Sequence, residues 1–316
     1  MKSNPNPPHI RLINGSLIAA TAVLVAAVLV LAAVPPVDRD ALSHHLAVPK
    51  LYLKNGGIYE LPSVPFSYYP MNLDLLYMLP LALGNDIFSK YIHFGFALLT
   101  GWLIFDYLRR RMGGAGYGLA GALLFLSLPV IVKLSITAYV DLGLIFFSTA
   151  ALLQLLRWAE TGLRFQHLAL AGIFAGLCLG TKVNGMLAVF LLPLGVPFIS
   201  RQPRGKIPSS SLNVTPGRFA DDTGLAHLLR AAVFVAIAAS VYSPWMVRNA
   251  LWTGNPIHPV AAKLLGSDKT AAAPEGVSIS AEGASGAEEH APQDSGLGHF
   301  VVRKIATVIA TGVLNV

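Results

Sequence analysis

Long apolar runs alternate with short polar or Gly/Pro-rich breaks along most of the chain. Crossing about 30 Å of hydrocarbon takes roughly 20 helical residues, and most of these runs approach or exceed that length. The two runs on either side of "TKVNG" are the shortest, so their boundaries are the least certain. The pattern predicts an all-α, multispanning membrane protein with seven helices near residues 17–34, 88–108, 115–134, 142–158, 167–181, 184–199 and 228–245.

The segment "MNLDLLYMLPLALG", residues 71–84, is apolar but short for a span. Counting it as a span would move the basic cluster Arg109 to Arg111 to the outside, against the tendency of Lys and Arg to stay in the cytoplasm. We therefore expect an interfacial or re-entrant helix here, within a first external loop at residues 35–87.

With the N-terminus inside, seven spans place every basic cluster between helices on the cytoplasmic side. These clusters are Arg109 to Arg111, then Arg157 and Arg164, and then Arg201, Arg204 and Lys206. The sequence thus predicts a cytoplasmic tail at 1–16, a transmembrane module at 17–260, a low-complexity external loop at 261–299 and the start of a further helix at 300–316.

Composition agrees with this picture, since 54% of the residues are hydrophobic and only 12% are charged. The net charge of +7 comes mostly from clusters beside apolar runs, which argues against a nucleic-acid partner. Cys178 is the single cysteine, so no intrachain disulfide can form. The abundance of Ala and Gly favours a bacterial inner membrane.

Polar side chains recur at the predicted external ends of the helices. They are Asp38 and Asp40 in "VDRDALSHHL", Asp141 in "TAYVDLGLIFF", Lys182 in "GTKVNG" and Arg248 in "SPWMVRNALWTGNPIHP". Polar groups that face one common side are what a catalytic or transport vestibule requires.

These motifs, together with "PFSYYPMNLDLLYMLPLALGND", resemble in order and spacing the multispanning lipid-linked sugar transferases of the GT-C class. The likeness is greatest to the protein mannosyltransferase and aminoarabinose transferase group, glycosyltransferase families 39 and 83, and covers roughly residues 17–260. The resemblance implies transfer of a sugar from a polyprenyl-phosphate donor to a lipid, glycan or protein hydroxyl, on the periplasmic face of the membrane.

Two carboxylates are the candidate catalytic groups. Asp40 matches the leading aspartate of the family's acidic motif, where a carboxylate can accept or orient the acceptor proton and stabilise an oxocarbenium-like transition state. Asp141 matches an aspartate of the second external loop. Each has a structural alternative, because both lie where they could cap a helix or pair with its dipole.

Four further residues are candidates for substrate binding. Lys182 matches a family lysine, and it and Arg248 are suited to a lipid phosphate, although snorkelling to the interface is the alternative reading. The family often has Asp-Glu where this chain has Asp40-Ala41, and Asp38 is a candidate substitute for the missing acid. His45 matches a histidine of bacterial relatives.

Adjacent histidines on a helix diverge by about 100°, so His44 and His45 do not predict a zinc site. No organic cofactor is expected, while the carboxylates leave room for a divalent cation. Two alternatives to the transferase stay open: a transporter or flippase for a lipid-linked or small anionic substrate, and an inactive relative that binds lipid-linked sugar. The early chain end would require a separate chain to supply the missing C-terminal part.

Overall fold

The computed structural model describes residues 7–200 and 224–258, and all regular structure within them is helical. The predicted all-α class is therefore confirmed. The helices are α1 (Pro8–Ala32), η1 (Ala41–His45), α2 (Ala47–Asn55), η2 (Pro65–Tyr68), α3 (Asn72–Ala82), α4 (Ile87–Met112), α5 (Ala115–Ser127), α6 (Pro129–Ser135), α7 (Asp141–Glu160), α8 (Phe165–Thr181), η3 (Val183–Gly185), α9 (Met186–Ser200) and α10 (Gly224–Thr253).

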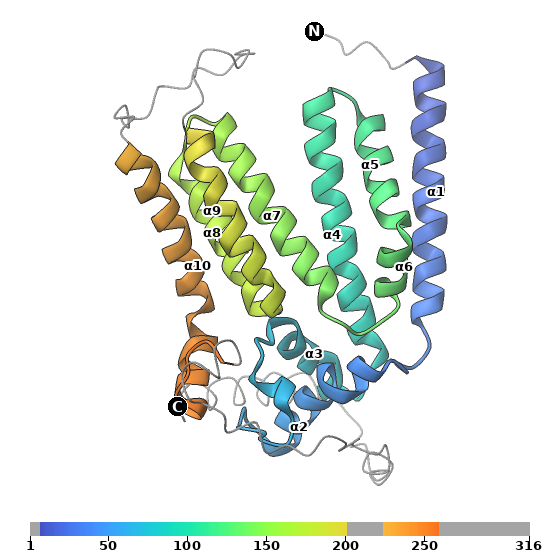
Figure 1. The fold of residues 1–316 in the computed structure, drawn as a ribbon. Coiled ribbons are helices and arrows are strands. Elements are labelled where there is room, and N and C mark those ends of the chain that lie inside the picture. The colour runs from blue at the N-terminus through green and yellow to red at the C-terminus, as the bar shows by residue number, and fades with distance from the viewer. Residues whose placement is uncertain (1–6, 201–223, 259–316) are drawn as a thin grey trace, which may run out of the picture.

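The long helices stand side by side, and the short helices of residues 35–87 cap one end of them (Figure 1). On one side α4 packs against α5, and α1 against α5; on the other, α8 packs against α7 and α10. Contacts between α4 and α7 join the two groups. The capping layer contains η1, α2 and α3, so the predicted helix at 71–84 exists as α3 within this loop.

Four described helices, α1, α4, α7 and α10, are long and apolar enough to cross a membrane. The pair α5 and α6 would make a fifth span, but it bends by 68° at Leu128, directly before Pro129. The apolar helices α8 and α9 are shorter. Every predicted span thus coincides with a helix or a bent pair, and the count of seven membrane crossings stays a prediction.

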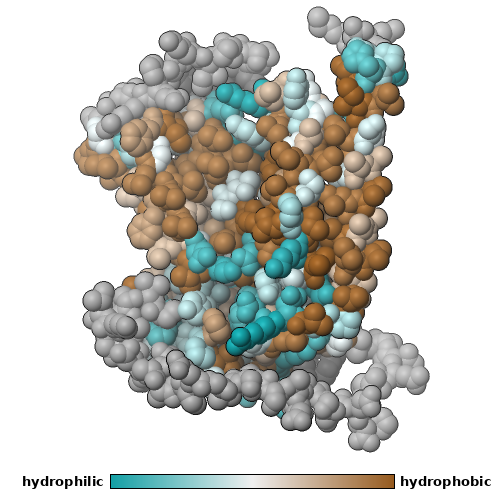
Figure 2. Space-filling view, turned by 45° about the vertical axis from the view of Figure 1, so that its right-hand side comes forward, coloured by the Kyte–Doolittle hydropathy of each residue, from teal (hydrophilic) through white to brown (hydrophobic). Residues whose placement is uncertain are grey.

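The face of the bundle seen in Figure 2 is apolar over a broad belt. On α1, for example, Val23 is 70% exposed and Val30 is 72% exposed. Such a surface is unfavourable in water and suits lipid, so the protein is an integral membrane protein. Polar residues gather below this belt, toward the capping layer (Figure 2).

Basic residues mark the end of the bundle opposite the cap. Asp106 near the end of α4 pairs with Arg109, Arg110 and, across the bundle, Arg157 of α7 at 3.0 Å. Helix α4 then stops at Gly113, whose φ of 74° a residue with a side chain rarely adopts. Arg201, Arg204 and Lys206 lie outside the described residues, as do the whole predicted loop at 261–299 and the segment 300–316.

Candidate functional site

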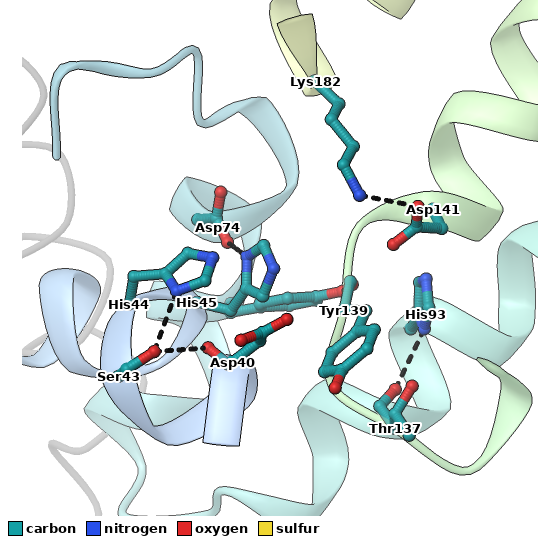
Figure 3. Close-up of polar contacts among 11 residues, drawn as sticks. Asp40, Ser43, His44, His45, Asp74, His93, Thr137, Tyr139, Asp141 and Lys182 are labelled. Atoms are coloured by element: carbon teal, nitrogen blue, oxygen red, sulfur yellow. Dashed lines mark hydrogen bonds and ion pairs between the residues drawn. The ribbon is translucent and has the colours of Figure 1, made fainter. Parts of the chain in front are cut away.

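Polar side chains from five parts of the fold meet where the capping layer touches the bundle (Figure 3). They come from η1, α3, α4, the start of α7 and the residue that follows α8. The group consists of Asp40, His44, His45, Asp74, His93, Tyr139, Asp141 and Lys182. Residues up to 142 positions apart in the chain, from Asp40 to Lys182, are thereby gathered at one end of the helices.

Asp141 and Lys182 form an ion pair, with Lys182 Nζ 2.7 Å from Asp141 Oδ1. Asp141 is the first residue of α7, directly after the N-cap residue Val140, and it is the acidic residue of the first turn. Lys182 ends α8 in an extended conformation, with φ of −156°, which turns the chain out of the helix. Both side chains keep part of their surface exposed, so the ammonium remains available to an anionic ligand.

Asp40 lies beside Tyr139 in the same group of residues (Figure 3). It is exposed, and no hydrogen bond or ion pair of its carboxylate is found within the described ranges. Burial raises the pKa of Tyr139, and the charges of Asp38, Asp40 and Asp141 raise it further. All three predicted carboxylates therefore lie near this one hydroxyl.

The alternative reading of Asp40 as a helix cap is wrong. Asp40 does precede η1, but its backbone is already helical and its side chain makes no capping bond. The Ser43 hydroxyl instead donates to the backbone carbonyl of Asp40 at 3.5 Å. The carboxylate is thus free for another role.

His45 pairs with Asp74, a residue that the sequence did not single out. Nδ1 of His45 lies 2.7 Å from Oδ1 of Asp74, and the two residues are only 7% and 2% exposed. Asp74 was overlooked because α3 looked like a plain apolar helix. Burying a single carboxylate in an apolar helix is unfavourable unless it has a partner. The presence of Asp74 in such a segment therefore indicated a buried partner.

His93 of α4 is a second residue that sequence reasoning missed. Its Nε2 accepts the backbone N–H of Leu142 at 2.9 Å, so Nδ1 carries the proton and donates to the carbonyl of Thr137, also at 2.9 Å. The ring thereby joins α4 to both sides of the turn before α7. This contact fixes where Asp141 begins its helix.

Asp38 lies near this group, whereas the contacts of Arg248 are with other residues. Asp38 is near Lys90 as well as Tyr139, and the Lys90 ammonium donates to the carbonyl of Val34 at 2.7 Å. Arg248 is buried between Trp245 and Trp252, with its guanidinium carbon 4.5 Å and 4.8 Å from the two ring centroids.

Arg248 also donates to the carbonyls of Tyr68 and Tyr69, at 2.7 Å and 3.1 Å. These bonds hold the η2 turn of the capping layer against α10. A buried Nη1 atom of the same group has no hydrogen-bond partner in the described residues. The guanidinium thus has a clear structural role, and its contact with a lipid phosphate stays a prediction.

The carboxylates predicted from the sequence could in principle bind a divalent cation. Within residues 7–200 and 224–258, no three His, Cys, Asp or Glu side chains are grouped as a bound ion would require.

A comparison with known proteins places this geometry in a family context. No curated protein and no solved structure matches the chain. A family model matches residues 76–210. This segment includes His93, Tyr139, Asp141 and Lys182, whereas Asp40, His45 and Asp74 precede it. Residues 76–210 match the family model of the dolichyl-phosphate-mannose-protein mannosyltransferases, which confirms the resemblance and indicates a membrane glycosyltransferase similar to the mannosyltransferases.

Proposed function

We propose that the protein is a GT-C glycosyltransferase that takes a sugar from a polyprenyl phosphate and transfers it to a hydroxyl on the periplasmic face of a bacterial inner membrane. The observation that carries the proposal is the meeting of Asp40, Asp141 and Lys182 at the end of the bundle opposite the arginine clusters. A donor that arrives through the bilayer would reach this site from the side, between apolar helices.

Each side chain has a task in this reaction. The leaving phosphate gains charge as the glycosidic bond breaks, and the Lys182 ammonium stabilises that charge. Asp141 holds Lys182 in place until the donor binds, and it binds the acceptor. Asp40, whose carboxylate has no competing partner among the described residues, orients the acceptor hydroxyl or accepts its proton, and its charge stabilises the positive sugar carbon.

Asp38 and His45 border the acceptor side of the same site. Asp38 lies near the Tyr139 hydroxyl, where it can replace in part the second acid that the family often has next to Asp40. The acceptor is a lipid, glycan or protein hydroxyl, and Arg248 is a further phosphate contact.

The experiment is sugar transfer by the purified protein in lipid nanodiscs, with tritium-labelled dolichyl-phosphate mannose as donor. Replacing Asp40 with Asn is expected to lower the rate about 10²- to 10⁴-fold, the range of general acid–base catalysis, with little change in folding because the carboxylate is exposed. Full activity of Asp40→Asn would reject its role. Movement of intact donor across the bilayer without a new glycosidic bond would instead support a flippase.

A further inference from the structure

The His45 and Asp74 pair is built into the capping layer by an unusual turn. Helix η1 has π geometry, in which the N–H of Leu46 bonds to the carbonyl of Ala41 at 2.9 Å. Such turns insert an extra residue per turn and are frequent at functional sites. Here the turn directs the His45 ring toward α3, where Asp74 is 2% exposed.

The proton on His45 can be placed from the contact itself. A carboxylate only accepts hydrogen bonds, so the 2.7 Å contact requires Nδ1–H of His45 to donate to Asp74. The neutral ring then has its lone pair on Nε2. In the described residues Nε2 has no hydrogen-bond partner, and that edge of the ring faces the space toward Asp141 and Lys182 (Figure 3).

We propose that His45, held and polarised by Asp74, is the base that accepts the proton of the acceptor hydroxyl, and that Asp40 orients this hydroxyl and stabilises the sugar cation. This inference rests on the proposed glycosyl transfer and divides a task that the proposed function left to Asp40. His45 is then a catalytic residue, and Asp74 is a positioning residue that acts through it.

The step balances without a further reactant. The acceptor oxygen bonds to the anomeric carbon while the bond from that carbon to the phosphate oxygen breaks. The bonding electrons leave with the polyprenyl phosphate beside Lys182, and the hydroxyl proton moves to Nε2 of His45. Asp74 stabilises the imidazolium, which later releases the proton to water.

The groups that face His45 come from every neighbouring element. They are Asp40 and His44 at η1, Asp74 and Tyr77 on α3, His93 on α4, Tyr139 and Asp141 at the start of α7, and Lys182 after α8. Lys182 is neutralised by Asp141, and His93 is committed to two backbone groups. Of the three histidines in this group, His44, His45 and His93, only His45 is hydrogen-bonded to a carboxylate in the described residues.

The test compares His45→Gln, Asp74→Asn and the double variant in single-turnover transfer from tritium-labelled dolichyl-phosphate mannose. A serine- and threonine-rich peptide and an alkyl mannoside serve as acceptors. The matched control is His167→Gln, since His167 bonds to Gln154 at the arginine-rich end of the bundle. His45→Gln should slow transfer about 10²- to 10⁴-fold without weakening donor binding. The double variant should be no slower than His45→Gln, because the two residues act as a unit.

A His45→Gly variant separates chemistry from structure, since added imidazole should restore part of its rate, most strongly above the pKa of imidazole. Full rates in folded His45→Gln, or a lack of imidazole rescue combined with additive losses in the double variant, would overturn the base assignment while the transferase stands. A wild-type protein that transfers no labelled sugar to either acceptor or to water from any of a panel of polyprenyl-phosphate sugars, dolichyl-phosphate mannose included, would overturn the proposed function and this inference together.

Discussion

At the scale of single residues, Ala41 shows how the site differs from the acidic motif that it resembles. The family often has a second acid at this position, next to the aspartate matched by Asp40. Ala41 is fully buried, with 0% of its surface exposed, and it packs in a cluster with Tyr77, Ala138 and Val140. A larger or charged side chain has no room there.

Placing an acid at position 41 is therefore expected to destabilise the folded protein. Ala41→Glu would bury a carboxylate against apolar neighbours and should lower the free energy of unfolding by several kcal/mol, on the order of 3. Thermal unfolding in detergent measures the effect. The control is Leu42→Glu, because Leu42 is 49% exposed. An Ala41→Glu protein that is as stable as the wild type, and more active, would contradict this reading of the cluster.

His44 gives a prediction about pH. Burial, the largest cause, lowers the pKa of His44 from 6.5 to about 3, the Lys182 ammonium adds to this effect, and the ring stacks on Phe66 at 4.4 Å. Between these two pKa values the unfolded chain binds the proton and the folded chain does not. The neutral ring thus contributes stability above pH 6.5 that is lost as the pH falls toward 3.

The melting temperature of the wild type should consequently fall more steeply than that of His44→Gln between pH 7 and pH 4. Scanning fluorimetry across this range in one detergent measures both slopes. Parallel slopes would show that His44 can take up its proton in the folded protein.

The residues named from the sequence and those that were missed differ in a physical way. Asp40, Asp141, Lys182 and His45 belong to recognisable motifs, and all four lie in one group of residues. Asp74 looked like an isolated acid in an apolar segment. Its partner is 29 residues away, and which residue meets a lone polar group depends on tertiary packing that periodicity does not encode.

At the scale of elements, apolar runs located the helices but not their irregularities. The predicted helix at 115–134 is broken into α5 and α6, although Pro129 gave a local signal because a proline disfavours helical backbone at the preceding residue. Residues Ala41–His45 in the loop before α2 form a π turn. No pattern of apolar residues distinguishes a π turn from an α turn over so few positions.

Close contact between α3, α8 and α10 gives a prediction at this scale. Trp245 Nε1 donates to Asn72 Oδ1 at 2.9 Å, and a Cβ added at Gly180 would lie 2.3 Å from Asn72 Nδ2. Gly180→Ala should push Asn72 away from Trp245, loosen the capping layer and lower both the melting temperature and sugar transfer. The cost should be about 1–3 kcal/mol, as for other overpacked sites.

The matched control is Gly95→Ala in α4, where the added Cβ would meet no atom within 4 Å. This change should be neutral or slightly stabilising, because Ala has the higher helix propensity. Equal effects of the two substitutions would show that α8 can move away from α3 at no cost.

At the scale of the whole molecule, the proposed function depends on which side of the membrane the capping layer occupies. The structure puts the arginine clusters of α4 and α7 at one end and the site at the other, in the order that the positive-inside rule predicts. We therefore expect the cap to lie in the periplasm. Labelling from one side of the membrane measures which face the cap occupies.

Cysteine labelling in intact cells supplies that measurement. Arg39 in the cap and Arg164 at the opposite end are both exposed, and the native Cys178 is only 1% exposed, so background labelling should be low. A maleimide that passes the outer but not the inner membrane should modify Arg39→Cys in intact cells and Arg164→Cys only after the inner membrane is opened. The reverse pattern would place the carboxylates and Lys182 in the cytoplasm, where soluble nucleotide sugars are available and a lipid-linked donor has no advantage.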